Sequence, residues 1–313
     1  MRPRPPIQIV VTPGSGDGTA IARARSLRRA LASRGRAARL RAFDGLDDLQ
    51  RWARTCAPTF SHLVAVGGDA TLSAAAPAAI RTGAAFLPVP TGFGNVFAGV
   101  LGHPSDAEAA VEVLEHGHVQ WLDVGVAPDG VFLSHQSYGF LARVQRVVEH
   151  GRRQPRHRRA RQLAYYRAAM RRFARGRFDR IRVEADGRLV AADAALVTVA
   201  NVPTYHGYLT LTPDASPADG RLDVCVIPRT TSARFVAQLL RLALELPGRW
   251  DGVLLRQARR VRVTVNRATP ASLRVAPAAL PVLLPEATAG RLVAPFPLPT
   301  GHPHAGRVGR RAG

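Results

Sequence analysis

Short apolar runs alternate with longer amphipathic stretches over the first 123 residues of the chain. The apolar runs predict buried strands, and apolar residues spaced three or four apart predict helices between them. The expected strands are Ile7–Val11, Ala38–Phe43, His62–Val66 and Ala85–Val89. The expected helices are 17–34, which ends at Gly35, 44–54, and a third that begins with the capping box Ser105-Asp106-Ala107-Glu108 and ends near His116. This alternation predicts an α/β fold with a doubly wound, Rossmann-like parallel-sheet domain, which binds ligands at the carboxyl ends of its strands.

The pattern changes after Asp123. Asp129-Gly130 and Asp186-Gly187 each lie between β-prone runs, which is the strongest short signal of a hairpin. Further strands are expected at Ala195–Ala200, Leu209–Thr212, Leu222–Ile227, Val261–Val265 and Pro281–Leu284, and helices near 157–175 and 231–246. These elements predict a second domain that is a mainly antiparallel β-sandwich.

The two patterns divide the chain into three expected parts. Residues 1–123 form the α/β domain, residues 124–289 the antiparallel domain, and residues 290–313 a tail rich in Pro, Gly and Arg. A strand in the tail is a candidate to return to the first domain. The last dozen residues of the tail are expected to be disordered.

Two glycine-rich turns follow the third and fourth expected strands. The first is Val66-Gly67-Gly68-Asp69-Ala70-Thr71, and the second is Pro90-Thr91-Gly92-Phe93-Gly94-Asn95. At such turns the backbone can approach a ligand closely, and the N–H groups and dipole of the following helix favour an anion. We expect Gly67 and Gly68 to offer N–H groups, and Thr71 a hydroxyl, to phosphate. Two such turns in adjacent strand–helix units predict one nucleoside triphosphate held between them.

Two polar residues of these turns have alternative roles. Asp69 cannot contact bare phosphate favourably at neutral pH, so its expected role is to hold Mg²⁺ or to orient an acceptor hydroxyl. The alternative is that Asp69 only caps the helix that begins near Ala70. Asn95 could hydrogen-bond a phosphate or a ribose, or it could serve as a structural turn residue.

The charge of the chain is +22, and arginine supplies all of its basic residues other than histidine. The absence of lysine excludes a P-loop lysine, a kinase β3 lysine and a Schiff-base lysine. Any cation that neutralises phosphate must therefore be arginine, histidine or a metal ion. Genomic base composition is one explanation of the arginine content, and attraction to anionic lipid or nucleic acid is the other.

Cysteine usage and hydropathy indicate a compartment. Cys56 and Cys225 are far apart and each lies in an apolar setting, which is typical of buried thiols in a reducing cytoplasm. No apolar run approaches the roughly 20 residues of a membrane-spanning helix, and residues 1–6 lack the apolar region of a signal peptide. The expected location is the cytoplasm, with peripheral contact at the inner face of the membrane as a possibility.

Five segments in order over residues 7–285 resemble the diacylglycerol kinase/sphingosine kinase catalytic-domain family, in its bacterial lipid kinase branch. They are the two glycine turns, Val11-Thr12-Pro13-Gly14-Ser15-Gly16, Asn201-Val202-Pro203-Thr204-Tyr205-His206-Gly207, and Pro213-Asp214-Ala215 with Asp219-Gly220-Arg221-Leu222. Each segment alone is weak, but five in order, on the expected strands and turns, favour this fold strongly.

The resemblance implies an ATP- and Mg²⁺-dependent kinase that phosphorylates a hydroxyl of diacylglycerol or a similar membrane lipid. The first domain would bind the nucleotide and the second the lipid. Asp69 would be catalytic, and Asp219 would bind a structural Mg²⁺, unless Asp219-Gly220 is a plain turn. The residues implied in nucleotide binding are Thr12, Gly14, Ser15, Gly67, Gly68, Thr71, Thr91, Gly92 and Asn95.

The chain departs from the family pattern at several positions. Ala70 replaces a glycine, Ala74 a glutamate, Phe93 a threonine and Val96 an aspartate. Asn266-Arg267-Ala268 stands where the family has the Asp-Gly-Glu that supplies its proposed general base. The remaining candidates for that base are Asp69, Asp219, His206 and Glu286. An alternative function is therefore a catalytically lapsed member that binds nucleotide or lipid without turnover.

Two other functions share single features with this chain. NAD kinase has the Gly-Gly-Asp turn, but its characteristic Asn-Glu pair is missing after Asn95 and after Asn201. The arginine-rich segment Arg152–Arg177, with Tyr166, Met170 and Phe173 at helical spacing, predicts either a basic helix on an anionic membrane or a packed helix with a solvated arginine face. Arginines with interleaved aromatic residues also suit nucleic acid, but no recognised binding motif accompanies them. The sequence does not decide whether the protein forms a homodimer.

Overall fold

A four-stranded parallel sheet forms the N-terminal part of the computed structural model, which describes residues 6–15, 18–91, 94–144, 179–205, 209–244 and 246–288. Its strands are β1 (Ile7–Val11), β2 (Ala38–Ala42), β3 (His62–Gly67) and β4 (Ala85–Pro90), in the order β2-β1-β3-β4. The strands pair in register, with Ile7 beside both Ala38 and His62. All four therefore end at the same edge of the sheet, where the turns of interest begin.

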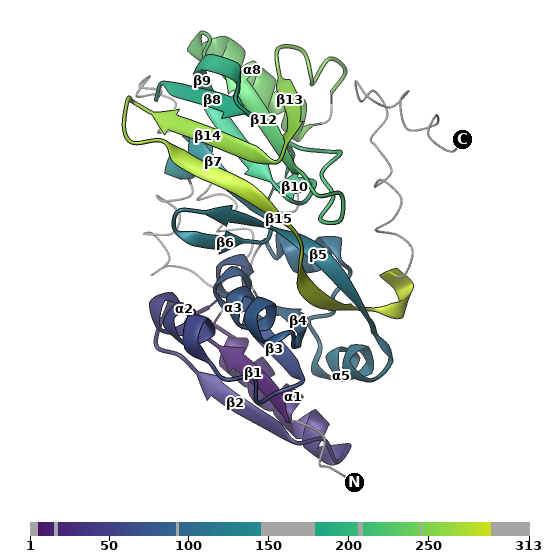
Figure 1. Ribbon diagram of the computed structural model, residues 1–313. Coiled ribbons are helices and arrows are strands. Elements are labelled where there is room, and N and C mark those ends of the chain that lie inside the picture. The colour runs from purple at the N-terminus through teal and green to yellow at the C-terminus, as the bar shows by residue number, and fades with distance from the viewer. Residues whose placement is uncertain are drawn as a thin grey trace, which may run out of the picture.

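Helices cover both faces of this parallel sheet, as the doubly wound pattern predicts (Figure 1). Helices α1 (Ala20–Ser33) and α5 (Ala107–His116) pack on one face, and α2 (Leu46–Thr55), α3 (Asp69–Thr82) and α4 (Val96–Val100) pack on the other. Buried alanines of α3, such as Ala75 and Ala79, bring that helix close to the sheet. The residue that caps α5 is Asp106 and not the predicted Ser105, because the Asp106 carboxylate accepts the Ala109 N–H at 3.0 Å.

The antiparallel part follows and joins the same sheet, which has 13 strands among the described residues. Its strands are β5 (His118–Ala127), β6 (Gly130–Phe132), β7 (His135–Gly139), β8 (Ile181–Ala185), β9 (Arg188–Ala200), β12 (Leu222–Pro228), β13 (Leu254–Ala258), β14 (Arg260–Val265) and β15 (Ala271–Leu284). A small hairpin, β10 (Thr204–Tyr205) with β11 (Leu209–Thr210), helix α8 (Ser232–Ala243) and the 3₁₀ helix η2 (Glu286–Thr288) complete the described elements. Two cores, one around Val199 and Val263 and the other around Phe140 and Phe235, lie in this part, as a β-sandwich requires.

Strand β15 connects the two parts of the molecule. Its first half pairs with β14, and its second half meets β4 in parallel through Val282 and Phe86. Along both halves it pairs with β5 (Figure 1). A bulge between Ala276 and Leu280, with Ala278 at φ 44°, lets the strand change partners. The two parts consequently share one hydrogen-bonded sheet.

The structure confirms the predicted fold class, and it extends the predicted strands. Strand β15 has 14 residues, whereas only Pro281–Leu284 was expected. Exposed and buried residues alternate in its first half, as in a half-buried strand, and Pro277 interrupts that pattern. Strands β7 and β13 were not expected. The predicted helix at 157–175 and the tail 290–313 lie outside the described residues, and the division at position 123, which falls inside β5, stays a prediction.

Two findings bear on the expected compartment. Cys56 and Cys225 are both free thiols and both buried, as predicted. Among the described residues, no helix has the length and apolar character needed to cross a membrane.

Gly125 is a position where a larger residue would collide with a neighbouring ring. A Cβ atom there would lie 2.0 Å from Cζ of Phe132, its cross-strand neighbour on β6. We expect Gly125→Ala to lower the free energy of unfolding by about 1–3 kcal/mol, because the Phe132 ring must move. Chemical denaturation would measure this loss. The matched control is Gly45→Ala, where a Cβ meets nothing within 4 Å and whose loss should be clearly smaller. Equal losses in the two variants would contradict the packing argument.

Candidate functional site

Three hydroxyl groups meet at the carboxyl ends of β1 and β3. Thr71 Oγ1 lies 2.9 Å from Thr12 Oγ1 and 2.9 Å from Ser15 Oγ. The Gly68 N–H donates to Ser15 Oγ at 3.1 Å. The turn after β1 is therefore bound to the first glycine turn through side chains that the sequence predicted to face phosphate. Gly14 lies in the same turn, with open space where a side chain would start.

Gly67 and Gly68 shape the backbone of the first glycine turn. A Cβ atom on Gly67 would lie 2.4 Å from Cβ of Thr71, so only glycine fits there. Gly68 is the N-terminal cap residue of α3 in an extended conformation. Ala70 lies inside α3 and has no positive φ, so its replacement of a family glycine causes no backbone strain.

Asp69 joins the two glycine turns. It is the first residue of α3, and its carboxylate accepts the N–H of Val96 at 3.0 Å and the N–H of Phe97 at 3.1 Å. These two N–H groups belong to the free N-terminus of α4, which favours a negative charge. Asp69 thus caps α4 across the turns, and not its own helix. Burial raises the pKa of Asp69 above its ordinary value, whereas the two N–H groups act in the opposite direction.

The second glycine turn lies directly beside the first. The Thr91 N–H donates to the Gly67 carbonyl at 3.0 Å, and the buried Thr91 hydroxyl has no hydrogen-bond partner among the residues that the structure describes. Asn95 is the cap residue of α4 and has φ 44°, a left-handed conformation that asparagine tolerates. Gly92 lies outside the described residues. The structure thus brings together the described members of the predicted phosphate-binding set.

One residue beside these turns escaped the sequence analysis. Arg23 of α1 donates from Nη1 to the carbonyl of Pro90 at 3.0 Å and to that of Ser105 at 3.4 Å. It brings a guanidinium to the end of β4, in a chain that has no lysine. Its position on a helix rich in arginine gave no signal that would set it apart.

A second polar centre surrounds Asp123 of β5. Its buried carboxylate accepts the N–H of Gly220 at 2.6 Å and the N–H of Ala278 at 2.7 Å. The amide of Asn201, also buried, donates to the Asp123 carbonyl at 2.9 Å and to the Leu133 carbonyl at 3.2 Å. Asp123 therefore fixes the Asp219-Gly220 turn to the junction between the two parts. The sequence analysis treated this residue only as the point where the pattern changes.

Asp219 belongs to this centre and approaches a further carboxylate. Its Oδ1 accepts the N–H of Arg221 at 3.0 Å, as in a plain Asp-Gly turn, and the Gln257 amide lies 3.4 Å from its Oδ2 and 3.3 Å from Oδ1 of Asp223. Burial raises the pKa of Asp219 to about 6, and the nearby Asp123 adds to this shift. Burial together with the charge of Asp219 raises the pKa of Asp223 well above its ordinary value. The raised pKa values mean that their surroundings disfavour the ionised form of both carboxyl groups.

The two centres are connected through packed elements, and among the described contacts Asp69 and Asp219 share no hydrogen bond. One turn after Asp69, Ser73 Oγ accepts the Leu133 N–H at 3.4 Å, and the Leu133 carbonyl accepts the Asn201 amide. Hairpin β10–β11, which belongs to the segment after Asn201, lies against α4 and α8. The second part of the molecule therefore faces the glycine turns.

The structure also describes the β14–β15 turn and Glu286, which bear on the question of the general base. Asn266 and Arg267 form the β14–β15 turn with φ values of 50° and 62°, and Asn266 Oδ1 accepts the Arg180 N–H at 2.9 Å. Ala268 offers no carboxylate there. Glu286 is exposed on η2, which is bound to Leu101 through Thr288. His206 lies outside the described residues.

Comparison with known proteins gives matches over both parts of the chain. The family model "Diacylglycerol kinase catalytic domain" matches residues 6–127, and "YegS C-terminal NAD kinase beta sandwich-like domain" matches residues 134–284. A Pseudomonas putida protein named "Probable lipid kinase YegS-like" is 29% identical over 58% of this chain and 61% of its own length. A diacylglycerol kinase of Staphylococcus saprophyticus is 24% identical over 58% of this chain and 59% of its own length. The matched regions thus span about three-fifths of the length of these two curated relatives.

Solved structures resemble the fold over nearly the whole chain. A structure from Bacillus anthracis str. Sterne has a TM-score of 0.72 at 18% identity and covers 91% of this chain and 96% of its own. A diacylglycerol kinase from the same strain has a TM-score of 0.66 at 16% identity and covers 91% of this chain and 98% of its own. At such identities the likeness concerns the fold alone.

The bridge made by Asp69 should contribute measurably to stability. We expect Asp69→Ala to lower the free energy of unfolding by about 1–3 kcal/mol, because two partly buried N–H groups lose their acceptor. Asp106→Ala is the matched control, since it removes an ordinary, exposed helix cap and should cost about 1 kcal/mol. Denaturation of both variants would compare them. A smaller loss for Asp69→Ala than for Asp106→Ala would show that Asp69 does not hold the turns together.

Proposed function

Because this chain belongs to the bacterial family of diacylglycerol kinase-like proteins, we propose that it is a lipid kinase that uses ATP and Mg²⁺. It would transfer the γ-phosphoryl group of ATP to a hydroxyl of diacylglycerol or of a similar membrane lipid. The observation that carries this proposal is the Asp69 bridge, which holds the ends of β3 and β4 and the N-terminus of α4 in one place. A triphosphate needs such a set of converging turns, since phosphoryl transfer depends mainly on positioning and charge neutralisation.

In this proposal the three turns hold the phosphates through backbone N–H groups and hydroxyls. Gly67 leaves room for the Thr71 side chain, and Thr12, Ser15 and Thr71 present hydroxyls at the same edge. A phosphate that binds the Gly68 N–H would replace its bond to Ser15 Oγ. The buried hydroxyl of Thr91, which has no partner within the described part of the chain, supports a polar ligand at the second turn. Gly14, Gly92 and Asn95 complete the proposed nucleotide site. Bound Mg²⁺ would supply the charge neutralisation that a chain without lysine needs beside its arginines.

Asp69 has two tasks in this proposal. Its oxygens already accept two N–H groups, so it positions the turns, and its remaining lone pairs can bind a water or a metal ion. The raised pKa of Asp69 also suits a group that accepts a proton from the lipid hydroxyl. Asp69 is accordingly the proposed catalytic residue.

Asp219 is the proposed ligand of a divalent cation in the second centre. Burial is the main cause of the raised pKa values of Asp219 and Asp223, and a neighbouring carboxylate adds to each shift, Asp123 for Asp219 and Asp219 for Asp223. A hard cation with oxygen ligands would remove this repulsion. We therefore assign Asp219 to a structural Mg²⁺ that stabilises the turn beside Asp123.

The alternative function is a lapsed member that binds nucleotide or lipid without turnover. The observation that favours it is the β14–β15 turn, where Asn266 and Ala268 replace the acidic residues of the family. A loose transition state needs only a weak base, however, so the missing carboxylate lowers the expected rate more than it forbids the reaction.

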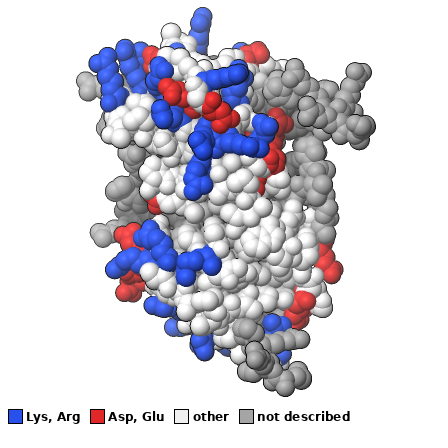
Figure 2. All heavy atoms as spheres, viewed as in Figure 1, with Lys and Arg blue, Asp and Glu red and all other residues white. Residues whose placement is uncertain are grey.

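The lipid substrate implies peripheral contact with an anionic membrane at the cytoplasmic face. Figure 2 shows arginines gathered over the upper part and the lower left of the viewed face, with a band of uncharged residues between them. Arginine clusters attract anionic headgroups. Charge alone, however, does not fix one orientation of the protein on the membrane. The arginine-rich segment 152–177, which could contribute to this contact, lies outside the described residues.

Transfer of labelled phosphate from ATP to lipids tests the proposed reaction. We expect incorporation into dispersed diacylglycerol in the presence of Mg²⁺, and a loss of about 100-fold or more in Asp69→Asn, because the reacting groups are misplaced. Asp106→Asn, an exposed helix cap far from the chemistry in sequence, should keep the rate of the unchanged protein. No incorporation into any lipid, together with a rise in melting temperature on adding ATP, would favour the lapsed alternative.

Removal of the metal tests Asp219. Because the pKa of Asp219 in the folded state is raised from 3.8 to about 6, ionisation destabilises the fold as the pH rises through that range in the absence of divalent cations. Mg²⁺ should therefore raise the melting temperature at pH 7.5 more than at pH 5, and Asp219→Asn should abolish the difference. Asp129→Asn, in the exposed β5–β6 turn, is the control. An equal effect of Mg²⁺ on Asp219→Asn would overturn the assignment.

A further inference from the structure

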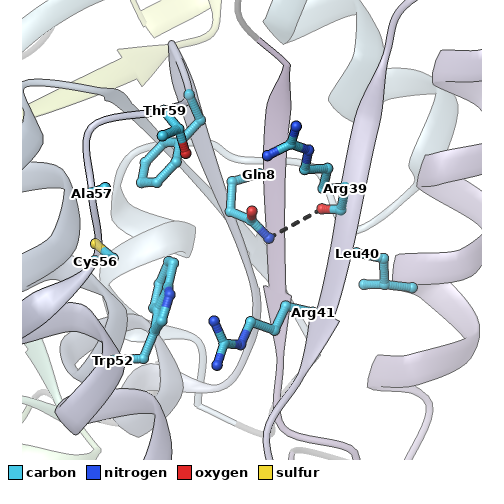
Figure 3. A pocket seen from close by; sticks show the side chains of 9 residues that line it. Gln8, Arg39, Leu40, Arg41, Trp52, Cys56, Ala57 and Thr59 are labelled. Atoms are coloured by element: carbon cyan, nitrogen blue, oxygen red, sulfur yellow. Dashed lines mark hydrogen bonds between the residues drawn. The ribbon is translucent and has the colours of Figure 1, made fainter.

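A hollow of about 390 Å³ opens between strand β2 and helix α2 (Figure 3). Its floor carries the polar side chains of Gln8, Arg39 and Arg41, and its wall includes Trp52, Cys56 and Phe60. The residues that line it belong to neither the turn after β1 nor the two glycine turns. This hollow is therefore separate from the proposed nucleotide site.

The hollow exists because the edge of the sheet is only partly covered. Strand β2 is the last strand of the parallel sheet, and α2 covers Val10 and Phe43 but leaves the earlier part of β2 open. Gln8 is a polar residue on this face, and its amide donates to the Arg39 carbonyl at 3.2 Å (Figure 3). The floor is consequently polar where a core would otherwise form.

Two guanidinium groups face this hollow without acidic partners. Arg39 and Arg41 are two residues apart on one strand, so their Cα atoms are about 6.6 Å apart and their side chains emerge on the same face. Neither forms an ion pair with any residue that the structure describes, whereas Arg51 nearby pairs with Asp48. Figure 2 shows arginines beside acidic residues over the region where Figure 1 places α2, whereas the lining of the hollow includes Arg39 and Arg41 and no acidic residue. The hollow therefore has a local excess of positive charge.

Aromatic rings fix the orientation of one of these cations. The Arg41 guanidinium lies 4.9 Å from the ring centre of Phe43 and 5.7 Å from that of Trp52. Trp52 in turn stacks on Phe60 with ring centres 6.2 Å apart. A guanidinium held against rings loses less freedom when it binds an anion, and its N–H groups remain in one plane.

We propose that this hollow binds a phosphate monoester, with the phosphate on Arg39 and Arg41 and an apolar or flat substituent against Trp52 and Phe60. A phosphate monoester carries nearly two negative charges at neutral pH, which match the two cations. Guanidinium groups also bind its oxygens in pairs. A lipid phosphate and a soluble phosphate ester share this chemistry. The proposal does not depend on the proposed kinase reaction.

An adjoining hollow of about 630 Å³ shares Arg41 and Trp52 and provides an internal comparison. It is lined by Arg51 and Arg54 but also by Asp44 and Asp48. Mixed charge suits an anion less well than the floor of the first hollow does. Because Arg54 lines only the second hollow, a substitution of Arg54 can tell binding in one hollow from binding in the other.

Titration calorimetry on the full chain, without ATP or Mg²⁺, tests the proposal. The probes are inorganic phosphate, phenyl phosphate and dihexanoyl phosphatidate below its micelle concentration. We expect one of the two esters to bind more tightly than inorganic phosphate, phenyl phosphate if the occupant is a soluble aromatic ester and phosphatidate if it is a lipid. Arg39→Gln and Arg41→Gln should each weaken this binding about tenfold or more, the effect of losing a charge-assisted hydrogen bond.

Two arginine variants outside the floor are the controls. Arg54→Gln lies in the adjoining hollow only, and Arg29→Gln is exposed on α1, so neither should change the affinity more than about twofold. Thermal unfolding of all four variants checks that they fold. Equal weakening in the floor and control variants, or no binding of any probe, would overturn the proposal and leave Arg39 and Arg41 as charges that protect a sheet edge. Neither outcome would alter the kinase proposal, which the phosphate-transfer assay tests separately.

Discussion

The two hydrogen bonds from the N-terminus of α4 to the Asp69 carboxylate are the interaction on which the candidate site depends. They satisfy backbone N–H groups that a short helix cannot satisfy itself, and they place a carboxylate where a helix dipole favours it. Because Asp69 is also the first residue of α3, this contact adds a side-chain link between two strand–helix units whose strands β3 and β4 are already paired. The hydroxyl cluster of Thr12, Ser15 and Thr71 then attaches the end of β1 to the same point.

A second constraint comes from Asp123 and the strand β15. Asp123 accepts N–H groups from Gly220 and from Ala278, which lies in the bulge where β15 changes partners. The same strand meets β4 at Phe86, in the parallel sheet that carries the glycine turns. The position of the Asp219 turn relative to those turns is therefore set by the main sheet, and not by a flexible linker. This rigidity suits a reaction in which a lipid hydroxyl must meet a phosphate held by the other part.

Much of the candidate site was predictable because its residues follow one another closely in the chain. A buried strand followed by Gly67 and Gly68 can be recognised from the local sequence. Glycine is needed at position 67 because the Thr71 side chain packs against the backbone there. The role of Asp69 was only partly predictable. The sequence suggested a metal ligand or a cap of its own helix, whereas its carboxylate caps α4, which begins 27 residues later. Arg23 and Asp123 gave no local signal, because their partners lie far away in sequence.

The alternation of apolar runs and amphipathic stretches was sufficient for the order of the elements, the parallel sheet and the change to antiparallel strands, because these depend on periodicity within short segments. Three-dimensional packing was needed to reveal that both parts share one sheet, since β15 pairs with residues more than a hundred positions earlier. The hollow beside β2 likewise arises only from the incomplete cover of an edge strand by α2. Periodicity records which face of a segment is buried, whereas the partner that buries it is chosen by contacts between distant segments.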